Sequence, residues 1–257
     1  MTIKFIILGS GSSMGVPRAD GYSGNCNLNN IKNFRTRCSA LIKFDDSNIL
    51  IDTSPDLRSQ LLKNKIKSID KVFYTHLHAD QTHGINDLRP FYLIKKKQIA
   101  VFADVKTSKY LNSTFKYCFK SSYGYPSTLE LKKLENKHIF KNKKKKIQIE
   151  SIPTQHGKIE SICYLINKKL AYASDISLFY KKDYKKLFNL DYLIVDCLWY
   201  RKHSAHFNLD QVLELIKILE PKKTILTNMH SDLDYDQLKK KLPKNVVPGY
   251  DGMTINL

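Results

Sequence analysis

Three histidines and one aspartate fall within eight residues of this chain, directly after the apolar, β-favouring run Lys71-Val72-Phe73-Tyr74. Side chains alternate across a strand with a period of two, so His76 and His78 are predicted to point the same way. Asp80 can turn back to the same place as the chain leaves the strand. Imidazole and carboxylate groups are ligands that zinc, manganese and iron accept. The segment therefore predicts a metal site at the end of a strand.

Potential ligands recur after four further apolar runs, at His156, Asp175, His206 and His230. Binding sites of α/β folds are built in this way, from loops at one rim of a rigid sheet. No cysteine belongs to the cluster, so a closed structural zinc site is not expected. A mixed histidine and carboxylate site with open positions suits hydrolysis. The ligands suffice for two metal ions, and the two oxygens of Asp175 make it the natural bridge.

The hydrophobic pattern predicts strands and helices with no linker and no repeat. We expect strands over 3–9, 39–44, 48–52, 71–75, 99–103, 147–153, 162–166, 170–173, 192–196, 224–227 and 253–256. We expect helices from about residue 55 and over 84–95, 106–119, 209–219 and 234–241, with Asn208 as an N-cap. Residues 120–144 have no clear pattern. This order predicts a single domain over 1–257, of the α/β class, in which helices cover two stacked sheets.

Composition sets the expected surroundings of this domain. The net charge is +19, yet only six of the 43 basic residues are arginine. A lysine excess beside abundant Ile and Asn is typical of a biased genome, so nucleic acid is a possible but not a favoured partner. No apolar run reaches about 18 residues, so we expect no membrane partner. Five scattered cysteines without a Cys-x-x-Cys favour a reducing cytoplasm. A homodimer is compatible with the sequence.

Arginine in a chain this rich in lysine suggests a task that lysine does poorly, such as bidentate binding of a phosphate. Arg18, Arg37 and Arg89 lie beside the motifs and are candidates for orienting the substrate. The loop at 9–15 is glycine-rich but matches neither the dinucleotide-binding nor the P-loop pattern. Its glycines predict a close backbone approach, with an anion as one candidate.

The His-x-His-x-Asp segment, His156, Asp175 and His230, taken in order, resemble the metallo-β-lactamase superfamily of hydrolases. The segments 9–18, 35–39, 52–56 and 203–207 resemble one branch of it, which contains phosphoribosyl 1,2-cyclic phosphate phosphodiesterase. The resemblance implies a four-layer αβ/βα sandwich. It also implies hydrolysis of a small, cyclic ribose or nucleotide phosphodiester by a metal-bound hydroxide.

Carried over by position, the resemblance assigns the metal ligands and the catalytic residues. Two divalent ions, zinc or manganese, are expected. The first is held by His76, His78 and His156, the second by Asp80 and His230, and Asp175 bridges them. Besides its role as a ligand, Asp80 is expected to be catalytic. His206 is expected to face the substrate, where it would bind phosphate or protonate the leaving oxygen.

Gln81 departs from the family motif, which reads His-x-His-x-Asp-His. A neutral amide is a poor ligand for a transition metal compared with imidazole, so the second site is expected to be weak or rebuilt. His83 lies two residues on and is a candidate replacement. Two alternatives to a small-molecule phosphodiesterase stay open: a transfer-RNA 3′-end endoribonuclease of the same fold, and a metal-binding or nucleic-acid-binding homologue with little catalysis.

Overall fold

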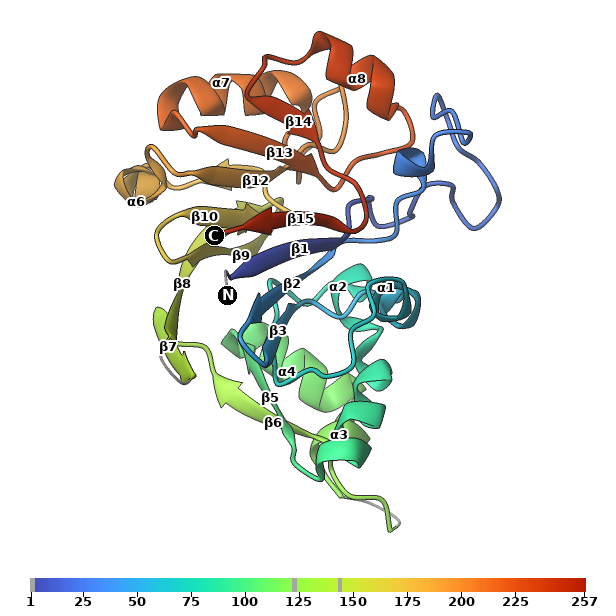
Figure 1. Ribbon diagram of the computed structural model, residues 1–257, viewed down its shortest axis with the longest axis vertical. Helices are drawn as coiled ribbons and strands as arrows, with labels where there is room; N and C mark the ends of the chain where they lie inside the picture. The colour runs from blue at the N-terminus through green and yellow to red at the C-terminus, as the bar shows by residue number, and fades with distance from the viewer. Residues whose placement is uncertain (1–2, 122–123, 143–144) are drawn as a thin grey trace.

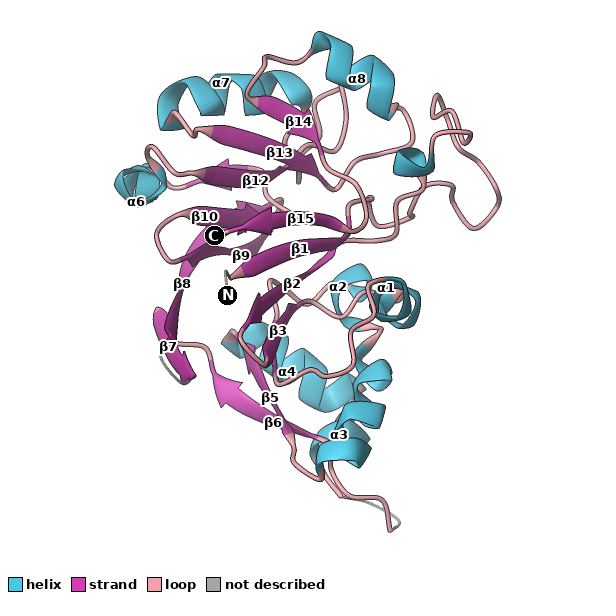
Figure 2. Ribbon diagram, viewed as in Figure 1, coloured by secondary structure: helices cyan, strands magenta, loops and turns pink. Residues whose placement is uncertain are grey.

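The computed structural model describes residues 3–121, 124–142 and 145–257. Two β-sheets lie face to face, and helices cover the outer face of each sheet (Figures 1 and 2). The predicted α/β architecture of two stacked, helix-covered sheets is therefore confirmed. None of the described helices is long and apolar enough to cross a membrane.

The first sheet contains seven strands in the order β15-β1-β2-β3-β4-β5-β6. The strand bounds are β1 (Lys4–Gly9), β2 (Ser39–Phe44), β3 (Ser47–Ile51), β4 (Lys71–Phe73), β5 (Ile99–Ala103), β6 (Leu129–Lys133) and β15 (Met253–Asn256). Pairing is antiparallel from β15 to β3 and parallel from β3 to β6. Because β3, β4 and β5 are parallel, their carboxyl ends lie at one edge, and the histidine segment leaves the sheet there.

The second sheet follows the order β11-β8-β9-β10-β12-β13-β14, and β7 also pairs with β8. The strand bounds are β7 (Lys137–Asn142), β8 (Lys145–His156), β9 (Ile159–Ile166), β10 (Leu170–Ala173), β11 (Leu178–Phe179), β12 (Tyr192–Asp196), β13 (Lys223–Thr227) and β14 (Val246–Pro248). The strands β10, β12, β13 and β14 are parallel neighbours. Their carboxyl ends carry Asp175, Asp196 and Asn228.

Eight α-helices and three short 3₁₀ helices lie in the described chain. The α-helices are α1 (Leu57–Lys63), α2 (Ala79–Thr82), α3 (Arg89–Lys95), α4 (Val105–Thr114), α5 (Lys116–Phe119), α6 (Tyr184–Leu187), α7 (Leu209–Leu219) and α8 (Tyr235–Lys241). The 3₁₀ helices are η1 (Ile31–Asn33), η2 (Ile85–Leu88) and η3 (Lys181–Asp183). One apolar cluster joins α1, α3, α4 and α5 to the first sheet, and another joins α6, α7 and α8 to the second.

A third apolar cluster fills the space between the two sheets. Phe5 and Ile42 of the first sheet and Tyr172 and Ile194 of the second are all completely buried there. The rings of Phe5 and Tyr172 lie 5.4 Å apart, so the inner faces are in direct contact. This rigid double sheet fixes the distances between loops that are far apart in the sequence.

Most predicted elements are found, and the differences have local causes. The predicted helix over 84–95 is η2 followed by α3, and the one over 106–119 is divided at Phe115. The stretch 120–144, which carries no clear pattern, contributes β6 and β7 from its described residues, and at these sheet margins only Leu129 is buried. Asn208 caps α7 as predicted, and Gln211 completes a capping box.

Candidate metal centre

Six of the predicted site residues line one pocket of about 410 Å³: His78, Asp80, His156, Asp175, His206 and His230. His156 is the last residue of β8, and the others come from the segments that follow β4, β10, β12 and β13. His76 lies directly beneath, with 1% of its surface exposed. The prediction that these strand ends deliver their side chains to one place agrees with the structure.

His76, His78 and His156 form a three-histidine group. The Nδ1 atom of His78 lies 3.0 Å from Nε2 of His76 and 3.3 Å from Nε2 of His156. All three nitrogens lie within 4.8 Å of one another. Neutral imidazole carries one N–H and one lone pair, so the group could hold an ion only if these three nitrogens carry the lone pairs.

The surroundings of His76 place its proton on the other ring nitrogen. The hydroxyl of Thr75 donates to Oδ2 of Asp52 at 2.9 Å, which leaves its oxygen free to accept a hydrogen bond. That oxygen lies 3.0 Å from Nδ1 of His76. The hydrogen-bond network therefore assigns the proton to Nδ1 and the lone pair to Nε2, the nitrogen that faces the other histidines.

His156 is fixed by a backbone group. Its Nδ1 atom lies 2.7 Å from the carbonyl oxygen of Ala205, which can only accept, so Nδ1 donates and Nε2 is left with its lone pair. Burial, aided by the charge of His206, lowers the pKa of His156 to about 4. Burial also lowers the pKa of His76 well below its usual value. Both rings are neutral at pH 7, as metal binding requires.

A carboxylate pair, Asp80 and Asp175, lies beside this group and is joined by Gln81. Nε2 of Gln81 donates to Oδ2 of Asp80 and to Oδ2 of Asp175, each at 3.1 Å. The other oxygen of Asp175 accepts from Nδ2 of Asn228 at 3.1 Å. Burial, with the charge of Asp80, raises the pKa of Asp175 to about 8.

His206 enters the pocket with a carboxylate partner behind it. Its Nδ1 lies 2.6 Å from Oδ2 of Asp196, a completely buried residue at the end of β12. Burial lowers the pKa of His206, but the charge and hydrogen bond of Asp196 outweigh that effect and raise it to about 9. Since Nδ1 is engaged, Nε2 is the nitrogen available to a ligand. Asp175, His156 and His206 form a second group whose ligand atoms lie within 4.8 Å of one another.

His230 lines the pocket but stays apart from the other ligands. Its ring lies 4.4 Å from the ring of Trp199, and Nδ1 lies 3.7 Å from Oδ2 of Asp232. Neither group of close ligand atoms found in the described ranges includes His230 or Asp80. The structure thus brings the predicted first-metal ligands together and leaves the predicted second-metal ligands separate.

His83 points away from the pocket. Its Nε2 lies 2.9 Å from the hydroxyl of Tyr110, and its ring meets the ring of Phe115 edge to face at 5.4 Å. His83 is the C-cap residue of α2, and its side chain is directed toward Tyr110 of α4. His83 therefore lies among aromatic side chains and not at the metal site, where a replacement ligand would have to lie.

The three arginines predicted to orient the substrate are all held elsewhere. Arg37 donates from Nε and Nη2 to the two carboxylate oxygens of Asp56, at 2.8 and 2.7 Å. Arg18 is paired with Asp20, and its guanidinium lies 4.9 Å from the centre of the Tyr22 ring. None of the residues that line the pocket is an arginine.

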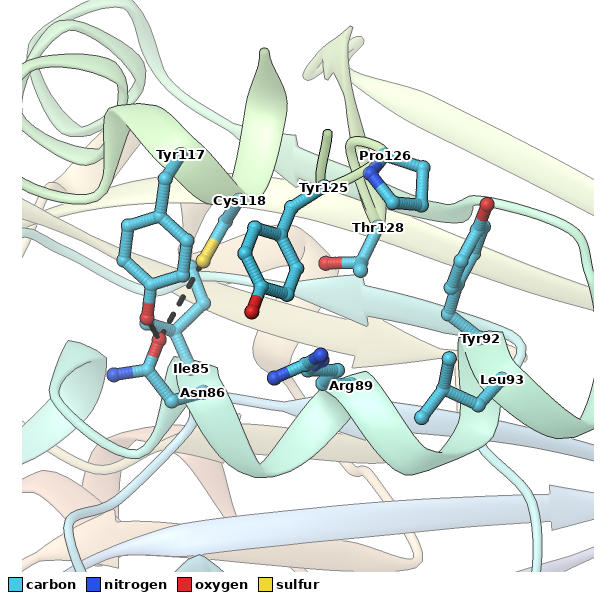
Figure 3. Close-up of a pocket in the computed structure, with 10 residues that line it drawn as sticks. All are labelled: Ile85, Asn86, Arg89, Tyr92, Leu93, Tyr117, Cys118, Tyr125, Pro126 and Thr128. Atoms are coloured by element: carbon cyan, nitrogen blue, oxygen red, sulfur yellow. Dashed lines mark hydrogen bonds between the residues drawn. The ribbon is translucent and has the colours of Figure 1, made fainter. Parts of the chain in front are cut away.

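Arg89 lies in a separate cavity of about 190 Å³ between α3 and the segment before β6 (Figure 3). Its guanidinium carbon lies 5.4 Å from the centre of the Tyr125 ring. Tyr92 and Tyr117 line the same cavity, and the latter hydrogen bonds to Asn86. This arginine is therefore part of an aromatic cluster and not of the histidine pocket.

Two polar residues that support the site were not predicted from the sequence: Asn228, which lines the pocket, and Asp196, which lies buried behind His206. Asp196 ends a predicted strand, which is the signal shared by the other acidic site residues. Asn228 follows a predicted strand and adopts a left-handed backbone, with φ of 58°. Asparagine tolerates a left-handed backbone better than most residues. An asparagine between the strand end at Thr227 and the candidate ligand His230 could therefore have been recognised from the sequence as a site residue.

The glycine-rich loop approaches the backbone of the chain itself. A Cβ at Gly9 would lie 2.0 Å from the carbonyl oxygen of Arg37, and one at Gly11 would lie 2.7 Å from that of Arg35. The amide of Ser12 donates to the carbonyl of Met229 at 3.2 Å. The loop therefore joins the first sheet to the segment that carries Asn228 and His230.

Comparisons with known proteins agree with this arrangement. A sequence profile of the Beta-lactamase superfamily domain matches residues 47–229. The crystal structure of a diphosphatase from the PhnP family is similar over 100% of this chain and 98% of that chain, with a TM-score of 0.89 and 29% identity.

Two curated relatives are longer proteins. An octanoyltransferase of Porphyromonas gingivalis (strain ATCC BAA-308 / W83) is 31% identical over 255 residues, which make up 98% of this chain and 51% of that protein. A ribonuclease Z of Prochlorococcus marinus (strain MIT 9215) is 30% identical over 126 residues, 47% of this chain and 39% of that protein. The chain thus spans about half or less of these relatives. The superfamily profile covers most of the chain and the fold matches throughout, so the chain belongs to the metallo-β-lactamase superfamily.

Proposed function

We propose that this chain is a metal-dependent phosphodiesterase that hydrolyses a small, cyclic ribose or nucleotide phosphodiester. The observation that carries the proposal is the three-histidine group, in which Thr75 and Ala205 hold the lone pairs of His76 and His156 toward Nδ1 of His78 at the wall of a pocket. The likeness to a PhnP-family diphosphatase supports phosphate chemistry. The octanoyltransferase name belongs to a protein twice as long and is not carried over.

Within this proposal, the ion is held by Nε2 of His76, Nδ1 of His78 and Nε2 of His156, with Asp175 adjacent. Neutral imidazoles and a carboxylate suit zinc or manganese. A divalent ion bound there supplies Lewis acidity toward a phosphate oxygen and lowers the pKa of water. The protons of His76 and His156 are already placed on their outer nitrogens, so these two rings need no change of tautomer when the ion binds.

His206 is the proposed proton donor to the leaving oxygen. Asp196 engages Nδ1 at 2.6 Å, which directs the Nε2 proton toward the pocket. With a pKa near 9, the ring is protonated at neutral pH before the reaction begins. A general acid must start in the protonated form, so this environment suits the task.

The test uses the purified protein loaded with zinc or manganese. Turnover is measured on bis-p-nitrophenyl phosphate, on a ribose 1,2-cyclic phosphate and on a nucleoside diphosphate, with and without chelator. Chelator-sensitive cleavage of either diester supports the proposal. Cleavage of the diphosphate alone would reassign the substrate class to phosphoanhydrides. No turnover on any of the three, with metal shown to be bound, would reject phosphate hydrolysis.

A transfer-RNA 3′-end endoribonuclease is the second candidate, favoured by the match to a ribonuclease Z and by the net charge of +19. Binding that depends on phosphate contacts weakens steeply as salt rises. Tight, salt-sensitive binding of precursor transfer RNA, together with cleavage at its 3′ end, would make RNA the substrate. Weak binding that is indifferent to RNA structure would favour the small diester.

A further inference from the structure

Gln81 lies between the two members of the carboxylate pair. Its side chain is completely buried on α2, and its amide nitrogen donates to Asp80 and, across 94 residues of sequence, to Asp175. An amide nitrogen with two hydrogens has no lone pair to offer an ion. A metal ligand at this position would need a lone pair that faces the ion. The amide nitrogen of Gln81 instead directs its hydrogens toward the two carboxylates.

The orientation of this amide follows from its partners. With Oε1 in the place of Nε2, an oxygen would face two carboxylate oxygens, so three lone-pair-bearing atoms would meet and the two hydrogen bonds from Nε2 would be lost. In the observed orientation, Oε1 is buried without a hydrogen-bond partner. Leaving an acceptor unpaired is costly, so the two hydrogen bonds from Nε2 must outweigh that cost.

Both oxygens of Asp175 are already engaged. Oδ2 accepts from Gln81 at 3.1 Å and Oδ1 accepts from Asn228 at 3.1 Å. A carboxylate bridges two ions by giving one oxygen to each, and here each oxygen already accepts from an amide. Asp80 gives Oδ2 to the same amide, and His230 lies against Trp199, outside both close ligand groups of the described chain.

We propose that this chain binds one catalytic ion, at the three-histidine group, and that the amide of Gln81 takes the place of a second ion by joining Asp80 to Asp175. The inference rests on the proposed metal-dependent function, but it concerns the number of ions and not the substrate. The amide supplies fixed hydrogen-bond donors where a second ion would supply positive charge. Both arrangements hold the two carboxylates close together.

The experiment counts ions on the whole protein. Metal-free protein is loaded with excess Zn²⁺ or Mn²⁺, passed through a desalting column and analysed by plasma mass spectrometry. We expect one tightly held ion per chain in the wild type and two in Gln81→His, since imidazole replaces the amide donor with a lone pair. Manganese electron paramagnetic resonance should show isolated ions in the wild type and a spin-coupled pair in the variant.

His83→Gln is the matched control, because it changes the neighbouring histidine that contacts Tyr110 and should leave the count at one. Two tightly held, spin-coupled ions in the wild type would overturn the proposal, whatever the variants do. A folded Gln81→His protein that still holds one ion would also overturn it. The count does not depend on turnover. One ion without phosphodiesterase activity would therefore reject the proposed function and leave this inference standing.

Discussion

The two sides of the pocket are built on opposite principles. In the three-histidine group, His76 and His156 present lone pairs to one point, and their protons are bound on the outside by Thr75 and Ala205. In the carboxylate pair, Gln81 donates to one oxygen of each residue, and Asn228 donates to the other oxygen of Asp175. A cluster of ligand-type residues therefore does not by itself make a metal site. The position of the protons around it decides whether an ion has somewhere to bind.

Removing a member of the three-histidine group should have the largest effect. We expect His78→Ala to lose the tightly bound ion and all detectable turnover, because two imidazoles alone hold zinc poorly. Metal content and hydrolysis of bis-p-nitrophenyl phosphate provide the measurement. His83→Ala is the control, and it should keep both. Full metal content in His78→Ala would show that the ion binds elsewhere.

Removing the proposed proton donor should have the next largest effect, without changing metal content. We expect His206→Gln to lower kcat by roughly 10²–10⁴-fold on a substrate with a poor leaving group, the usual contribution of a general acid. The loss should be much smaller with p-nitrophenol as the leaving group, because that phenolate leaves without a proton. Equal losses on both substrates would contradict the assignment of His206 as an acid.

Loosening the support behind the three-histidine group tests whether tautomer control matters. We expect Thr75→Val to weaken zinc affinity by about 10–100-fold, the range found when an outer partner of a ligating histidine is lost. Thr75→Ser keeps the hydroxyl and should retain most of the affinity. Thr254→Val, at an exposed position on β15, is the control for loss of a hydroxyl. Affinity is measured by competition with a chromophoric chelator.

The smallest effect is expected from Arg37, which the sequence suggested as a substrate ligand. The structure binds it to Asp56, and both side chains are partly exposed, so Arg37→Gln should lower the free energy of unfolding by up to about 1 kcal/mol. KM and metal content should change little. A large rise in KM without loss of stability would return Arg37 to the substrate site.

Much of the fold was predictable because its signals are local. The strands at 39–44, 99–103 and 253–256 have the predicted bounds, as does the helix over 209–219 with its Asn208 cap. Apolar runs, turn residues and helix caps determine the secondary structure of only the few residues around them. The strands β6 and β7, at the margins of the sheets, were not predicted. They are strands because they pair with β5 and β8, and the local sequence does not show that pairing.

The sequence by itself placed the histidines and acidic residues that follow apolar strands at one pocket, since a ligand placed after such a strand emerges at the rim of the sheet. Only the tertiary structure decided what they can do there. The carbonyl of Ala205 orients His156 from 49 residues away, and Gln81 reaches Asp175 across 94 residues. The carboxylate of Asp56 likewise accepts a hydrogen bond from the guanidinium of Arg37. Protonation and hydrogen bonding depend on distances of a few ångströms between segments that no local pattern relates, so the packing of the two sheets sets them.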